Sequence, residues 1–102
     1  AATAIGVVIP ELKGKLIGSA VRVPTPDGSL VHLVVTLNQN KKTCKTEEIN
    51  ALFKKHAAST LKNILEYSED PLVSSDIIGN PNSCIFDSEL TECVGDKLVL
   101  IA

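Results

Sequence analysis

The chain has 102 residues, 44% of them hydrophobic and 22% charged, which are the proportions of one ordinary globular domain. The formal net charge of -2 offers no basic face for nucleic acid, and no apolar run approaches the ~20 residues that span a bilayer. Aromatic residues make up only 3% of the chain, so any core must be built mainly from aliphatic side chains.

The three cysteines, Cys44, Cys84 and Cys93, form no Cys-x-x-Cys pair. An odd count without metal spacing favours a reducing compartment over a disulfide framework, and we interpret all three as small packing residues. His32 and His56 lie far from any cysteine pair, so the pattern indicates no zinc site. One alternative is that Cys44, beside a lysine, is a nucleophile. A catalytic cysteine needs a base, however, and the sequence assigns neither histidine to that place.

The first half of the chain predicts a short helix followed by a strand pair. Apolar side chains at helical spacing lie at Ile5, Val8, Ile9 and Leu12, and a proline at position 10 limits this helix to about two turns. Alternating side chains predict strands over Lys15 to Val23 and Leu30 to Leu37. Between them, Thr25-Pro26-Asp27-Gly28 is typical of a tight turn in which Gly28 takes a positive φ, so we expect the two strands to pair antiparallel.

The second half predicts one longer helix and several short strands. After a polar loop at Asn38 to Lys45, Thr46 is expected to cap a helix with Glu47 and Glu48 in its first turn. The apolar face of this helix would carry Ile49, Leu52, Phe53 and His56. Strands are predicted at Ile64 to Tyr67, Ser83 to Asp87, Leu90 to Val94 and Lys97 to Ile101, with a tight turn at Gly95-Asp96 and an extended or irregular stretch at Val73 to Gly79. The predicted class is α+β, with a mainly antiparallel mixed sheet and helices on one face.

None of these patterns names a reaction. No glycine-rich loop lies between a strand and a helix to hold phosphates, and no carboxylate pair is placed for acid–base chemistry. The densest acidic group, at Glu66, Glu69 and Asp70, is interpreted as a solvated turn.

Two longer stretches of the sequence indicate a protein family more specifically than these patterns do. The first runs IPELKGKL from Ile9 to Leu16 and GSAVRVPTP from Gly18 to Pro26, and the second runs VSSDIIG from Val73 to Gly79 and SCIFD from Ser83 to Asp87. In order and spacing they closely resemble the catalytic domain of phosphorylating glyceraldehyde-3-phosphate dehydrogenases, and the resemblance extends over essentially the whole chain. One departure is His32, which stands where an aspartate is common in the family.

The resemblance implies that residues 1–102 are an internal part of the C-terminal catalytic domain of an NAD-dependent, cytoplasmic homotetramer. It implies that Arg22 binds the substrate phosphate, as a planar guanidinium can do with two parallel hydrogen bonds. The cysteine nucleophile, its histidine, the Thr-Gly pair that binds inorganic phosphate and the Rossmann domain that binds NAD are expected upstream of Ala1. A final helix is expected downstream of Ala102. Neither Cys84 nor Cys93 matches the nucleophile position.

The implied reaction converts glyceraldehyde 3-phosphate and inorganic phosphate to 1,3-bisphosphoglycerate through a cysteine thioester. Two alternatives stay open. One is the related erythrose-4-phosphate dehydrogenase, which Pro26 and Ile77-Ile78-Gly79 fit less well. The other is a non-catalytic interaction or antigen fragment, which the missing nucleophile permits.

Overall fold

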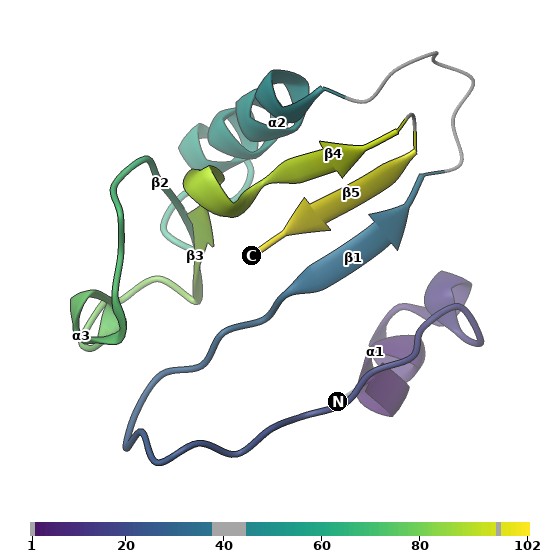
Figure 1. Cartoon of the computed structure of the whole chain (residues 1–102), viewed down its shortest axis with the longest axis horizontal. Helices are drawn as coiled ribbons and strands as arrows, with labels where there is room; N and C mark the ends of the chain where they lie inside the picture. The colour runs from purple at the N-terminus through teal and green to yellow at the C-terminus, as the bar shows by residue number, and fades with distance from the viewer. Residues whose placement is uncertain (1, 38–44, 96) are drawn as a thin grey trace.

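The computed structural model of the chain describes residues 2–37, 45–95 and 97–102, and its helices and strands lie within those ranges (Figure 1). In chain order they are α1 (Ala2–Val8), the 3-10 helix η1 (Pro10–Leu12), β1 (Leu33–Thr36), α2 (Thr46–Ala58), β2 (Leu65–Ser68), α3 (Ser74–Ile77), β3 (Cys84–Asp87), the 3-10 helix η2 (Ser88–Leu90), β4 (Glu92–Val94) and β5 (Leu98–Ile101). No helix in this part of the chain has both the length and the apolar character needed to cross a bilayer.

The strands form two small sheets. The three-stranded sheet has the order β1-β5-β4 and is antiparallel throughout, with Val35 and Cys93 both opposite Val99. The two-stranded sheet pairs β2 with β3 in parallel and places Tyr67 opposite Phe86. The backbone N–H of Asp87 donates to the carbonyl of Ala102 at 3.1 Å and so connects the ends of the two sheets. The α+β class and the mainly antiparallel sheet are confirmed.

The predicted pairing of Lys15 to Val23 with Leu30 to Leu37 is wrong. Residues 16–23 are extended but belong to no strand, and only the last part of the second run becomes β1. β1 pairs with β5, a partner more distant in the sequence, and Leu37 continues that ladder by donating its N–H to the carbonyl of Lys97 at 2.7 Å. An alternating pattern indicates an extended chain, but it does not identify the strand that completes the backbone hydrogen bonds.

α2 is the predicted longer helix, with one correction at its start. Glu47 and Glu48 lie in its first turn as expected, but Thr46 is already helical, and Lys45 precedes it without a side-chain cap. Phe53 on α2 stacks on Phe86 of β3, with ring centroids 4.1 Å apart and planes 2° from parallel. This stack places α2 against the two-stranded sheet.

The segment predicted to be extended or irregular at Val73 to Gly79 contains α3. Its turn is closed by Asp76, whose carboxylate Oδ2 accepts from the N–H of Val73 at 2.8 Å while its own N–H donates to the Val73 carbonyl at 2.9 Å. Such local pairing can hold a single helical turn in place, although the apolar pattern is too short to predict one. Most of the predicted polar loop, residues 38–44, lies outside the described residues, as does Asp96 of the predicted tight turn.

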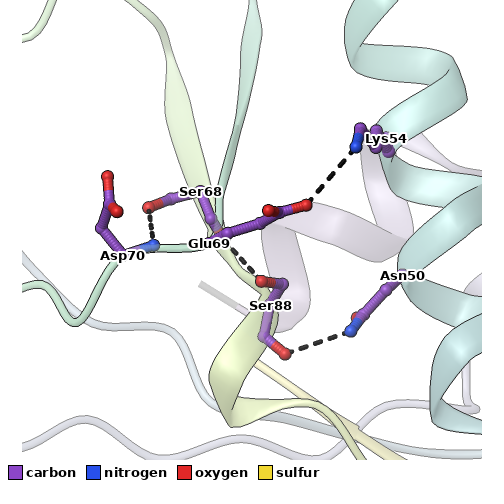
Figure 2. Close-up of polar contacts among 6 residues, drawn as sticks. All are labelled: Asn50, Lys54, Ser68, Glu69, Asp70 and Ser88. Atoms are coloured by element: carbon purple, nitrogen blue, oxygen red, sulfur yellow. Dashed lines mark hydrogen bonds and ion pairs between the residues drawn. The ribbon is translucent and has the colours of Figure 1, made fainter.

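The core is small and lies between α2 and the sheets. Leu65, Phe86 and Val99 are its buried hydrophobic residues, at 7%, 4% and 4% exposure. Next to them, the buried Ser88 hydroxyl donates to the Ser68 carbonyl at 2.6 Å, and Asn50 of α2 donates from Nδ2 to the Ser88 carbonyl at 3.2 Å (Figure 2). These bonds connect α2, β2 and η2 around the aromatic stack.

The acidic group that the sequence analysis interpreted as a solvated turn (Glu66, Glu69 and Asp70) lies on β2 and just after it. Glu69 and Asp70 are exposed, as expected for a solvated turn, and Lys54 of α2 lies 3.4 Å from Oε1 of Glu69 (Figure 2). Glu66 departs from the prediction: it lies on β2, is half-buried and accepts a hydrogen bond from Asn80 at 3.1 Å.

Candidate functional site

The residue singled out from the sequence, Arg22, lies on the extended stretch between η1 and β1. We call residues 16–32 the arm; in Figure 1 it runs from beside α1 along the outside of the molecule to β1. Alternation predicts a strand that carries Arg22 near its end, but the arm has no strand partner at this position. The Arg22 side chain is exposed. Within the described residues its guanidinium takes part in no ion pair or hydrogen bond.

A tight turn follows Arg22 on the arm, as the sequence predicts. Gly28 has φ +88°, a left-handed conformation that glycine adopts at little cost, and its N–H donates to Oδ1 of Asp27 at 2.8 Å. Just before it, the N–H of Thr25 donates to the carbonyl of Val23 at 2.8 Å. These bonds are local, so they shape the turn without fixing the arm to the sheets.

A groove of about 740 Å³ lies beside this turn. Its walls come from the second half of the arm, from α3 and from β3 with the residues that precede it; Asp27, Ile77, Asn82 and Asp87 are among them. Arg22 is not one of the described lining residues, although its neighbour Val23 is. The structure therefore brings the arm close to α3 and β3 but does not place the guanidinium in the groove.

The cysteines and histidines do not form a nucleophile–base pair in the part of the chain that the structure describes. Cys84 is exposed on β3, and Cys93 is half-buried on β4. Nδ1 of His56 lies 2.8 Å from the Thr60 hydroxyl and is occupied there, while His32 is exposed on the arm. Cys44, the alternative nucleophile, lies outside the described residues.

A dinucleotide would find no fitting cradle among the residues that the structure describes. The parallel β2–β3 pair is connected through α3, a helix of four residues, and no glycine-rich loop precedes that helix. No group of three or more histidine, cysteine, aspartate or glutamate residues in the described ranges is arranged to hold a metal ion.

Comparison with known proteins decides the family. The family model described as "Glyceraldehyde 3-phosphate dehydrogenase, C-terminal domain" matches residues 1–102. The chain belongs to this family. It is 49% identical over 102 residues to the glyceraldehyde-3-phosphate dehydrogenase of Mycobacterium tuberculosis and 49% identical over 102 residues to that of Kitasatospora aureofaciens, covering 100% of this chain in both cases. It is also 50% identical over 91 residues, 89% of the chain, to glyceraldehyde-3-phosphate dehydrogenase 2 of Streptomyces avermitilis.

The chain spans under a third of the length of these relatives: 29% of the mycobacterial protein, 30% of the Kitasatospora protein and 26% of the Streptomyces protein. The aligned region is the C-terminal part of the dehydrogenase, which confirms the family that the sequence resemblance indicated.

The structure adds a feature of the arm that the sequence did not predict. The Thr-Pro-Asp-Gly pattern indicates a turn with a left-handed glycine, but it carries no information about which side chain the turn contacts. In the folded chain the side chain nearest to a Cβ placed on Gly28 is that of Ile77 in α3.

Proposed function

We propose that this chain is part of an oxidoreductase of glycolysis, a phosphorylating glyceraldehyde-3-phosphate dehydrogenase. The enzyme would oxidise the aldehyde of glyceraldehyde 3-phosphate and join inorganic phosphate to the resulting acyl group, giving 1,3-bisphosphoglycerate through a cysteine thioester. The observation that carries the proposal is the family match, which extends over the whole chain and includes the stretch around Arg22.

The proposed contribution of this chain is phosphate binding by Arg22. A guanidinium is permanently charged and presents its N–H groups as a planar fork, which suits two parallel hydrogen bonds to phosphate oxygens. The exposure of Arg22 and its lack of a partner among the described residues are consistent with this role, because a guanidinium already paired with a carboxylate would have to give up that pair. Arg22 would hold the substrate in a fixed position relative to the reacting groups.

The remaining chemistry is assigned to other parts of the protein. NAD is the proposed electron acceptor, held by a Rossmann domain outside this chain, since the described residues do not fit it. The thioester-forming cysteine is also proposed to lie outside, because the family resemblance matches neither Cys84 nor Cys93 to the nucleophile position. We further propose a cytoplasmic homotetramer.

The test is a steady-state assay of the full-length protein that contains this chain. We expect NADH formation that requires both glyceraldehyde 3-phosphate and inorganic phosphate, with a larger kcat/KM than for erythrose 4-phosphate. A preference for erythrose 4-phosphate would assign the protein to the related dehydrogenase. Absence of NADH formation with either aldehyde would favour a non-catalytic role and contradict the proposal.

A further inference from the structure

The turn that follows Arg22 lies beside α3, and both line the same groove. A Cβ atom placed on Gly28 would lie 3.1 Å from Cδ1 of Ile77 and 3.6 Å from its Cγ1, at or below the usual separation of about 3.5–4.0 Å between carbon atoms. The turn backbone therefore lies next to the Ile77 side chain, and a methyl group added at Gly28 would require the end of that side chain to move by a few tenths of an ångström. Ile77 is half-buried, whereas its neighbour Ile78 is 50% exposed. Of these two adjacent isoleucines, only Ile77 lies against the turn.

α3 is itself fixed to the two-stranded sheet. The N–H of Asn80 donates to the Ile77 carbonyl at 3.1 Å, and the Asn80 side chain donates from Nδ2 to Oε2 of Glu66 at 3.1 Å. Glu66 lies on β2, opposite Ile85 of β3. A continuous set of contacts thus runs from the sheet through Asn80 and Ile77 to the turn at Gly28.

The arm has few other restraints. In the described part of the chain, the hydrogen bonds of residues 16–32 connect only residues within the arm, and Ile17 and Val21 are 100% and 85% exposed. Local bonds cannot fix the position of the arm relative to the sheets. Apart from the continuation of the arm into β1, the approach of Gly28 to Ile77 provides such a restraint, because Ile77 is connected through Asn80 to β2.

We infer that Ile77 is a positioning residue for Arg22. The inference rests on the proposed phosphate-binding role of Arg22. Ile77 restrains the turn at Gly28, which lies between Arg22 and β1, and so limits the movement of the segment that carries the guanidinium. A bidentate contact needs both atoms of the fork in place, and a displacement of about 1 Å can cost up to about 100-fold in rate.

The experiment compares two aldehydes in the full-length enzyme: glyceraldehyde 3-phosphate, and glyceraldehyde, which lacks the phosphate. We expect Ile77→Ala to lower kcat/KM for the phosphorylated aldehyde about tenfold and to change it for glyceraldehyde by less than about twofold. The matched control is Ile78→Ala, which removes the same atoms at the next position and should change both values by less than about twofold. An equal loss on both aldehydes would make Ile77 merely structural and overturn the inference.

A double-mutant cycle tests whether Ile77 acts through Arg22. In the Arg22→Ala background, Ile77→Ala should cause less than about a twofold further loss, because the group that it positions is gone. Fully additive losses would overturn the inference. If Arg22→Ala lowers kcat/KM equally for both aldehydes, the proposed phosphate-binding role is wrong and the inference, which depends on it, is wrong as well. If Arg22→Ala is selective for the phosphorylated aldehyde and Ile77→Ala is not, only the inference fails. Should Ile77→Ala melt below the assay temperature, Ile77→Val provides the same comparison with a smaller selective loss.

Discussion

Arg22 offers five N–H donors on a stretch of chain that gives them no acceptor among the described residues. A solvated surface arginine and a ligand-binding arginine look alike in this respect, so kinetics must separate them. A ligand-binding arginine stabilises the bound phosphate of the substrate, so its replacement lowers the reaction rate. A solvated surface arginine makes no contact with the substrate, so its replacement leaves the rate unchanged.

The first prediction therefore concerns the chemistry of this side chain in the full-length enzyme. A charge-assisted bidentate contact is worth ~1.5–3 kcal/mol, so Arg22→Ala should lower kcat/KM for glyceraldehyde 3-phosphate roughly tenfold to a few hundredfold. Arg22→Lys should recover only part of this loss, because an ammonium is a point charge without the planar fork.

The control for both variants is a melting curve. Because Arg22 is exposed and packs in no core, the melting temperature should stay close to that of the wild type. Wild-type kcat/KM in the alanine variant would refute the phosphate role, and a large fall in melting temperature would show that Arg22 is a structural residue.

The contact of Gly28 with Ile77 allows a second prediction at the residue scale. Gly28→Ala introduces a Cβ at φ +88° and against Ile77, whereas Gly14→Ala introduces one at φ +80° with nothing within 4 Å. Both substitutions carry the backbone cost of ~1–3 kcal/mol for a left-handed residue. Only the first adds the contact with Ile77, so in urea unfolding of the full-length protein Gly28→Ala should be the more destabilising. Equal midpoints would contradict the close packing between the turn and α3.

At the scale of elements, the two-stranded sheet depends on α2 for its cover. Phe53 stacks on Phe86, and Asn50 and Lys54, on the same helix, make polar contacts at 3.2 and 3.4 Å with η2 and the end of β2. The ion pair is exposed on both sides, at 65% each, and contributes little. The aromatic stack therefore contributes more than this ion pair to holding α2 against the two-stranded sheet.

The third prediction is that Phe53→Ala destabilises the full-length protein by about 2–4 kcal/mol, somewhat less than for a fully buried phenylalanine because Phe53 is half-buried. Leu52→Ala is the matched control, since Leu52 is 51% exposed on the same helix and should cost less than about 1 kcal/mol. Chemical unfolding monitored by circular dichroism measures both. A Leu52 variant as destabilised as the Phe53 variant would contradict the assigned packing.

The elements also show what the sequence could and could not predict. α2, β3, β5 and the left-handed Gly28 were predictable, because each depends on local periodicity or turn chemistry. The partner of β1 was not, because β5 lies far along the chain and alternation carries no information about pairing. α3 was not predictable because one helical turn is shorter than the pattern that predicts a helix. Arg22 came from the family resemblance alone, and its placement on an unpaired arm was not foreseen.

At the scale of the whole molecule, the chain is open. Its accessible surface is 8126 Å², whereas a compact monomer of this mass would expose roughly 5,500 Å². Its radius of gyration is 14.7 Å, compared with about 13 Å for a compact domain of 100 residues. Apolar residues of α1, the arm and β1 are among those left exposed, including Val8, Ile17, Val31 and Val34.

The fourth prediction follows from this exposed surface. Exposed apolar side chains and an unpaired strand edge favour association, so the 102-residue chain on its own should be oligomeric, aggregation-prone or only partly ordered. Size-exclusion chromatography with light scattering, together with a thermal melt, measures this. A monodisperse monomer with a cooperative transition would contradict the prediction.

The central proposal is that this chain is part of a phosphorylating dehydrogenase and contributes phosphate binding but neither the nucleophile nor the NAD site. The most direct test assays the purified fragment and the full-length protein side by side for NADH formation from glyceraldehyde 3-phosphate, NAD and inorganic phosphate. We predict phosphate-dependent NADH formation by the full-length protein and none above background by the fragment. NADH formation by the fragment alone, or none by the full-length protein, would contradict the account.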